Sequence, residues 1–244
     1  MGTSIKGSGS AASAVRSALR GALILVLAVS AGQACAVAQD RQTAKAENAW
    51  DPGPLSTPYG DYLAARHAEA INDSPLAARL LERTLKHAPD DPEILRMALH
   101  QMLAAGYMGR AVAIAKRYLA LRPQSVFAGL TVAVDDVAAG RLDDGVKALK
   151  AIPNRGLGGY VVPMTLAWTL AGKKEVSEAF DTLEPFGKRR GLQFIHDLHA
   201  ALIHDFVGNT EEAGRLFEKV AGGENPHLRL VELAGSFYER HGQA

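Results

Sequence analysis

The sequence predicts an all-α protein built from repeated helix pairs. From Pro58 onward, amphipathic segments follow one another with little of the alternation that marks strands, and each ends in a turn signal. Glycines at the predicted turns recur at intervals of 34, 32, 36 and 34 residues, at positions Gly106, Gly140, Gly172, Gly208 and Gly242. Asn72 lies 34 residues before Gly106, and Pro89 and Pro123 are also 34 apart. Two kinds of turn with one period indicate a helical repeat.

The repeat spans residues 57–244 and divides into five helix pairs and one unpaired terminal helix. The first helices of the pairs are expected at 58–71, 92–105, 126–139, 158–171, 192–206 and 227–241. The second helices are expected at 75–87, 109–121, 143–151, 174–186 and 210–221.

The residue types at fixed places in the repeat have structural explanations. Glycine suits the turn between paired helices because it adopts a positive φ without a Cβ clash, and asparagine tolerates the same conformation. Small residues early in the second helix let the two helices approach closely, and larger ones a turn later fill the space between them. We assign the small role to Ala77, Ala111 and Ala213, and the large role to Leu81, Leu149 and Phe217.

The segment FVGNTEEAGRLFEKV, residues 206–220, resembles the turn and second helix of a tetratricopeptide repeat (TPR), with Ala213 and Phe217 at the small and aromatic places. The second repeat is similar, with Gly106, Ala111, Tyr118 and Pro123 in order. The repeats depart from the family pattern because none has the tryptophan early in its first helix. The resemblance implies a right-handed α-solenoid whose concave face is lined mainly by first helices; with the N-terminal segment described below, the chain resembles an exported bacterial TPR protein.

The same resemblance implies a partner-binding groove. In the family, the groove-facing residues are the second, fifth, ninth and twelfth of each repeat, counted so that the turn glycine is the fifteenth. The candidate groove residues are Tyr62, Arg66, Arg96, His100, Phe127, Leu130, Val134, Leu166, Leu198 and Leu202. The alternative is that tight winding turns the apolar members into core. No carboxylate clamp is expected, because Arg66 and Arg96 are its only candidates.

The N-terminus has the order of charges and apolar residues of a secretory signal peptide. Three basic residues accompany an apolar run at 21–32, and Ala36-Val37-Ala38 precedes Gln39 in the small-residue pattern of a cleavage site. We expect residues 1–38 to be removed, 39–56 to be a flexible linker, and the mature chain to be periplasmic or secreted, without a stable membrane span. A lipoprotein anchored at Cys35 is the weaker alternative.

The charge balance gives no argument for nucleic acid or an anionic membrane surface as a partner. The chain has 27 Lys and Arg against 26 Asp and Glu, and loss of residues 1–38 removes three basic residues, leaving 24 against 26. The mature chain would be mildly acidic, with no excess positive charge to favour nucleic acid. Charge does not choose among the other partner classes; the expected partner, a protein or peptide, is what the TPR resemblance implies.

The sequence contains no recognisable catalytic or cofactor motif, and we expect no cofactor and no enzymatic activity. The alternative is a metal-binding protein or hydrolase that uses His196, His199 and His204. Five residues separate the last two, about 140° around a helix, so the three do not converge from one helix. Two short motifs are expected to be connections between helices: GLGG at 156–159 and Lys188-Arg189-Arg190.

The last predicted helix has an apolar side with no second helix to cover it, formed by Val231, Ala234 and Tyr238. We expect that the chain is the front part of a longer TPR protein, or that a partner or a second copy covers this helix by self-association. The alternative is that this helix is itself the cap and leaves some apolar surface exposed. Taken together, the sequence indicates a non-enzymatic interaction scaffold in the assembly of a cell-envelope or surface structure.

Overall fold

The computed structural model describes residues 57–222 and 228–242. The predicted signal peptide and linker, residues 1–38 and 39–56, lie outside the described residues. Within the described ranges the chain consists of helices and turns and contains no β-strand. It forms two compact units that divide after Ala138. We call residues 57–138 the N-terminal unit and the described residues from Ala139 onward the C-terminal unit.

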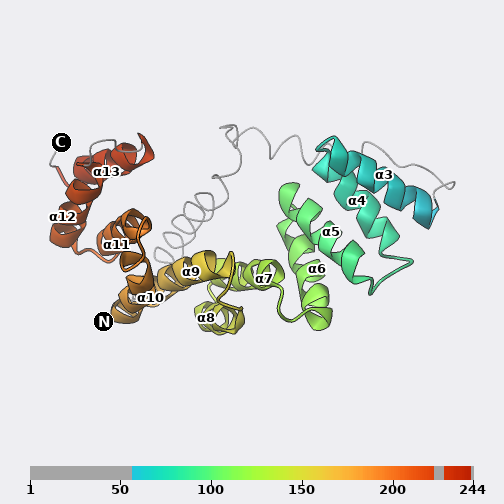
Figure 1. Ribbon diagram of the computed structural model, residues 1–244, viewed down its shortest axis with the longest axis horizontal. Coiled ribbons are helices and arrows are strands. Elements are labelled where there is room, and N and C mark those ends of the chain that lie inside the picture. Colours follow the sequence, from blue (N-terminus) through green and yellow to red (C-terminus); the bar gives the residue numbers. More distant parts are fainter. Residues whose placement is uncertain (1–56, 223–227, 243–244) are drawn as a thin grey trace, which may run out of the picture. The chain divides into compact units, whose positions relative to one another are not determined.

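The N-terminal unit contains two complete helix pairs and one further first helix (Figure 1). Its helices are α3 Pro58–Ala70, α4 Ser74–Thr84, α5 Pro92–Ala104, α6 Met108–Leu121 and α7 Val126–Ala138. Each helix packs on the next one along the chain. The core between them includes Leu81, Leu95, Leu99 and Met102, each at most 1% exposed.

The C-terminal unit follows the same pattern. Its helices are α8 Leu142–Ala151, α9 Gly158–Gly172, α10 Val176–Gly187, α11 Gln193–Phe206, α12 Thr210–Ala221 and α13 Leu228–Arg240. Consecutive helices again pack on one another. The core of the last three helices centres on Phe217 and Phe237, whose rings lie 4.9 Å apart. Every helix end agrees with the sequence prediction to within three residues; the largest difference is at α4, which ends at Thr84 rather than at residue 87.

A residue with positive φ follows each first helix and sets the repeat. These residues have φ between 60° and 86° and are spaced by 34 throughout, at Asn72, Gly106, Gly140, Lys174, Gly208 and Gly242. The prediction of Gly172 as the fourth turn residue was wrong: Gly172 is the last residue of α9, and Lys174 adopts φ 68°. The irregular glycine intervals of 32 and 36 thus become two intervals of 34.

The positive φ allows the chain to close a Schellman turn at the end of the first helix. In this motif the residue after the left-handed one donates its N–H to the carbonyl five residues earlier. The structure contains this bond at Asp73 to Ala68, Tyr107 to Met102, Glu175 to Leu170 and Asn209 to His204, with N···O distances of 2.8 to 3.0 Å. The turn satisfies helix-end carbonyls and reverses the chain into the second helix.

The small and large places of the second helices also recur with a spacing of 34. The small residues are all buried: Ala77, Ala111, Gly145, Ala179 and Ala213. The residues one turn later are also buried: Leu81, Ala115, Leu149, Leu183 and Phe217. Each of the six residues to which a role was assigned, Ala77, Ala111, Ala213, Leu81, Leu149 and Phe217, is at most 1% exposed, as packing between paired helices requires.

A buried carboxylate pairs with a partly exposed cation at the same place in the repeat in both units. Asp61 is 5% exposed and lies 3.0 Å from Arg83, and Asp197 is 6% exposed and lies 2.7 Å from Lys219. In each case the carboxylate is on the first helix and the cation is on the second helix of the same pair. Burial raises the pKa of Asp197, but its bonds to Lys219 and His196 together hold that pKa below its usual value.

The turn at Lys174 allows a test of whether positive φ at a non-glycine residue lowers the stability of the fold. A non-glycine residue in the left-handed region costs about 1–2 kcal/mol, so Lys174→Gly should raise the free energy of unfolding by about 0.5–1 kcal/mol despite the greater entropy of an unfolded glycine. The same substitution at Lys147, on the exposed side of α8 in the same unit, should lower it by about 1 kcal/mol. Urea denaturation of both variants would measure the two signs, and equal destabilisation would contradict the assignment.

Candidate functional site

The first helices of the N-terminal unit contact one another directly through side chains. Arg66 of α3 donates to the sulfur of Met97 of α5 at 4.0 Å, and Gln101 of α5 donates to Oε1 of Glu69 at 3.2 Å. On the next boundary the ring of His100 packs against Phe127 of α7, with centroids 4.4 Å apart. The three helices α3, α5 and α7 therefore present one continuous surface.

Most of the predicted groove residues belong to this surface. We define the first-helix surface by seven of them: Tyr62, Arg66, Arg96, His100, Phe127, Leu130 and Val134. The α3 and α5 portion is polar, with the side chains of Arg66 and Arg96 52% and 43% exposed. The α7 portion is apolar and half-buried, since Leu130 and Val134 follow Phe127 at helical spacing. Their role in binding a partner stays a prediction.

The charges on the first-helix surface are largely matched. Arg66 pairs with Glu69 at 3.3 Å, and Arg96 pairs with Glu93 at 2.9 Å. The bond to Glu93 raises the pKa of Arg96. Burial, together with the charge of Arg96, lowers the pKa of His100, so that its imidazole is neutral at pH 7 and packs on Phe127 as an uncharged ring.

The predicted groove residues of the C-terminal unit require two corrections. Leu198 is 5% exposed and packs in the core with Phe217, so only a small edge of its side chain reaches the surface. Leu166 was placed by counting from Gly172; counted from Lys174, the ninth place of this repeat is Trp168 instead. Leu202 is half-buried against the same core as Leu198. The alternative that some apolar residues are core holds here.

The three histidines of α11 have three separate sets of contacts. Nδ1 of His196 lies 3.0 Å from the Asp197 carboxylate, and the ring of His204 stacks on Phe180 at 4.3 Å. Nδ1 of His199 accepts a hydrogen bond from the indole N–H of Trp168 at 3.0 Å. Across residues 57–222 and 228–242, no three metal-ligating side chains are grouped to hold an ion. The arrangement therefore gives the metal or hydrolase alternative no converging set of ligands.

The Trp168–His199 bond joins two successive first helices, α9 and α11. His199 is 6% exposed, and burial lowers its pKa to about 4, so the neutral ring serves as the acceptor for the indole. Trp168 also packs edge-on against Phe206, with ring centroids 6.1 Å apart. Sequence reasoning missed this pair, because the register error at Gly172 concealed the position of Trp168.

His199 should give the stability of the protein a defined pH dependence. The folded chain keeps this ring neutral down to about pH 4, whereas the unfolded chain protonates it near pH 6.5. Its contribution is therefore complete above about pH 6.5 and is lost as the pH falls toward 4, by about 3 kcal/mol in all. His199→Gln, which cannot titrate, should reduce this slope in urea denaturation, whereas exposed His67→Gln should keep it; equal slopes in all three proteins would contradict the assignment.

The structure brings together two motifs that lie apart in the sequence. A pocket of about 270 Å³ is lined by residues of the GLGG segment, the start of α9 and the end of α10, including Gly156, Tyr160, Phe186 and Arg189. The guanidinium of Arg189 lies 5.6 Å from the centroid of the Tyr160 ring. The GLGG and Lys188-Arg189-Arg190 segments are thus neighbours in the C-terminal unit.

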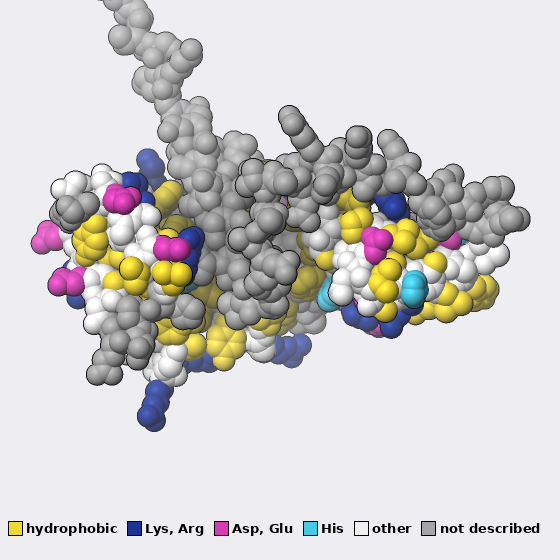
Figure 2. Space-filling model, turned by 90° about the horizontal axis from the view of Figure 1, so that it is seen from above, with side chains coloured by type: hydrophobic (Ala, Val, Ile, Leu, Met, Phe, Trp, Pro, Cys, Tyr) yellow, Lys and Arg dark blue, Asp and Glu magenta, His cyan; other side chains and the backbone are white. Residues whose placement is uncertain are grey.

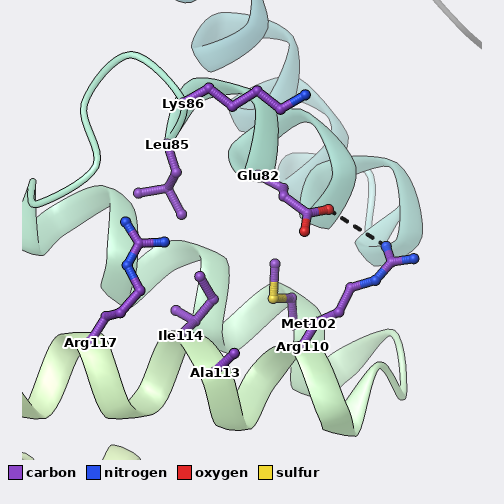
Figure 3. Close-up of a pocket in the computed structure, with 8 residues that line it drawn as sticks. All are labelled: Glu82, Leu85, Lys86, Met102, Arg110, Ala113, Ile114 and Arg117. Carbon is purple, nitrogen blue, oxygen red and sulfur yellow. Dashed lines mark ion pairs between the residues drawn. The ribbon is translucent and has the colours of Figure 1, made fainter.

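A second pocket lies in the N-terminal unit, between the second helices α4 and α6 (Figure 3). Its volume is about 290 Å³. We call it the α4–α6 pocket; it is lined by Glu82, Leu85, Lys86, Met102, Arg110, Ala113, Ile114 and Arg117. None of these residues belongs to the first-helix surface. Sequence reasoning missed this pocket, because Ala113 lies within the apolar run 111–115 and does not stand out from its neighbours.

The described surface mixes apolar and charged side chains. On the face drawn in Figure 2, hydrophobic groups reach the surface beside both basic and acidic ones. On α13, Leu228 and Val231 are 72% and 45% exposed, whereas Ala234 is buried and Tyr238 donates its hydroxyl to the Gly214 carbonyl at 3.4 Å. Only part of the predicted open side is therefore open, and self-association through α13 stays a prediction. No helix in the described residues is long and apolar enough to span a bilayer.

Comparison with solved structures identifies the fold. A tetratricopeptide repeat protein from Parabacteroides merdae superposes with a TM-score of 0.61 at 13% identity, covering 76% of this chain and 74% of that one. MamA from Desulfovibrio magneticus RS-1 superposes with a TM-score of 0.55 at 15% identity, covering 73% of this chain and 96% of that one. A further MamA structure gives 0.56 at 15% identity, over 76% and 94% of the two chains.

The chain has a TPR-like fold. No family model and no curated protein sequence matches it, so the assignment depends on structure. At identities of 13% to 15% the similarity shows the TPR-like fold alone and does not transfer a partner. The recurring Schellman turns and the buried small residues agree with it independently, because both follow the 34-residue period of TPR hairpins.

Proposed function

We propose that this TPR-like protein is a non-enzymatic scaffold that binds a peptide or protein partner along the first-helix surface. The observation that carries the proposal is the lateral contact of α3, α5 and α7 through Arg66–Met97, Gln101–Glu69 and His100–Phe127. These contacts hold successive first helices in one surface, so that a single extended or helical segment can contact all three. A protein surface of this kind needs no cofactor to act.

The composition of the first-helix surface favours a partner with both polar and apolar groups. Its α3 and α5 portion offers guanidinium and carboxylate groups that already pair with each other and can exchange partners. Its α7 portion offers Phe127, Leu130 and Val134, which are accessible at their edges. Apolar contacts at the centre of an interface contribute most of the binding free energy, and polar groups around them provide orientation.

The proposed setting is the cell envelope. We infer export from the order of basic, apolar and small residues in 1–38. A role in assembling an envelope or surface structure is inferred from this location together with the proposed scaffold function, which requires no catalytic chemistry. Because the overall charge is nearly balanced, the partner would be selected by the charged and apolar groups of a local surface rather than by net charge.

Leu130→Asp tests the first-helix surface. A carboxylate placed on the apolar α7 portion should weaken partner capture by about 2 kcal/mol or more, roughly 30-fold, because the interface would bury an unpaired charge. Leu121→Asp, on the second helix α6 and 40% exposed in the native chain, is the matched control and should retain capture. The measurement is capture from periplasmic extract, followed by affinity titration with the partner identified. Unchanged binding by a folded Leu130→Asp protein would refute the proposed surface.

Export has a separate test. Expression of the full-length chain in a bacterial host should yield periplasmic protein whose first residue is Gln39, read from the intact mass. Substitution of Ala36 and Ala38 by bulky residues should block this cleavage, because signal peptidase sites require small side chains. A cytoplasmic product that retains residues 1–38 would rule out the exported location.

A further inference from the structure

The α4–α6 pocket has an apolar floor that the fold leaves open to solvent. Leu85, Met102 and Ile114 come from three consecutive helical segments and are 4%, 1% and 6% exposed, so they are packed on their far sides and present only one edge to the pocket. Figure 3 shows these side chains directed toward one centre. A ligand that reaches the floor would meet preformed hydrocarbon.

The pocket exists because one side chain is short. Ala113 occupies a place in the second helix that recurs every 34 residues along the chain. At the same place in the other second helices, long or charged residues stand: Arg79, Lys147, Asp181 and Arg215. An arginine or lysine at residue 113 could extend over the floor, whereas alanine is too short to do so. Ala113 thus departs from the residue type found at this place in the other repeats, while the pocket floor remains packed in the core.

The rim of the pocket is predominantly positive. It has three cations, Lys86, Arg110 and Arg117, against one carboxylate, Glu82. Figure 3 shows the cationic side chains placed around the apolar centre.

Two of the rim cations are held in position. Arg110 lies 3.6 Å from Glu82 and rests over the Tyr107 ring at 5.1 Å. The Arg117 guanidinium donates to the carbonyl of Pro89, which fixes that group beside the pocket and leaves its charge without a counter-charge there. Lys86 makes no ion pair within the described part of the chain.

We propose that the α4–α6 pocket binds a peptide segment in which one bulky apolar side chain enters the pocket and an adjacent Asp or Glu pairs with the rim. The apolar floor selects the first group, and the charge of Lys86 and Arg117 selects the second. A volume of about 290 Å³ is near the lower limit of ligand pockets, which fits one side chain better than a cofactor. The proposal rests on the scaffold function but adds a second binding surface, made of second helices.

The test is a selection from a displayed library of random dodecapeptides on the immobilised protein, with depletion on the Ala113→Trp variant. Ala113 is exposed, so the indole can fill the pocket without entering the core. Recovered peptides should share an aromatic or large aliphatic residue with Asp or Glu within two positions. The absence of any enriched peptide, or enrichment of peptides without acidic residues, would overturn the proposal.

Titration of the recovered peptides then assigns the contacts. Lys86→Glu and Ala113→Trp should each weaken binding by about tenfold or more, while Lys116→Glu, exposed on α6 outside the pocket, should change it less than about twofold. Thermal unfolding would verify that all three variants are folded. Equal losses for Lys86→Glu and Lys116→Glu would show only a general charge effect and would also overturn the proposal.

Leu130→Asp separates this surface from the first-helix surface. It should leave the recovered peptides bound, because residue 130 is on α7 and does not line the pocket. If Leu130→Asp abolishes partner capture and the pocket variants do not affect the peptides, the scaffold proposal stands and the pocket proposal fails. If the pocket variants abolish peptide binding and Leu130→Asp has no effect on any partner, the reverse holds.

Discussion

The left-handed residue that ends each first helix is the constraint on which the rest of the structure depends. At Asn72, Gly106, Lys174 and Gly208 the N–H of the next residue donates to a carbonyl five residues earlier, and this bond turns the chain back along the helix it has just left. Once the reversal is fixed, the fifth residue beyond it is buried, and in every complete pair it is alanine or glycine, as at Ala77 and Gly145. The spacing of 34 between turns therefore also fixes the spacing of the core.

Much of this could be predicted from the sequence, because turns and close contacts require particular residue types. Glycine at a turn and alanine at a close contact can be recognised from residue type alone, without knowledge of the surrounding structure. Lys174 could not be recognised in this way, since lysine has no preference for positive φ and adopts it here under the control of its neighbours. The turn was instead assigned to Gly172, two residues earlier, and this shift led to the wrong choice of Leu166 as a groove residue.

The candidate site was less accessible to sequence reasoning for a different reason. Whether Leu198 is groove or core depends on how closely neighbouring helices approach, and a one-residue difference in register exchanges the two outcomes. The hydrogen bond between Trp168 and His199 depends on two side chains 31 residues apart meeting across helices, which no local pattern encodes. Conversely, the polar first-helix residues Arg66 and Arg96 were placed correctly at the surface, because they pair within their own helices.

Lys174 also affects how readily a repeat of this kind is recognised from sequence. One lysine in the left-handed region costs about 1–2 kcal/mol, a sum that a chain with many buried contacts can tolerate at a single turn. A single turn can therefore hold a residue other than glycine while the backbone path stays the same. Recognition by sequence then fails earlier than recognition by shape, which is the state of this chain: no family model matches, yet solved TPR structures superpose at 13% to 15% identity.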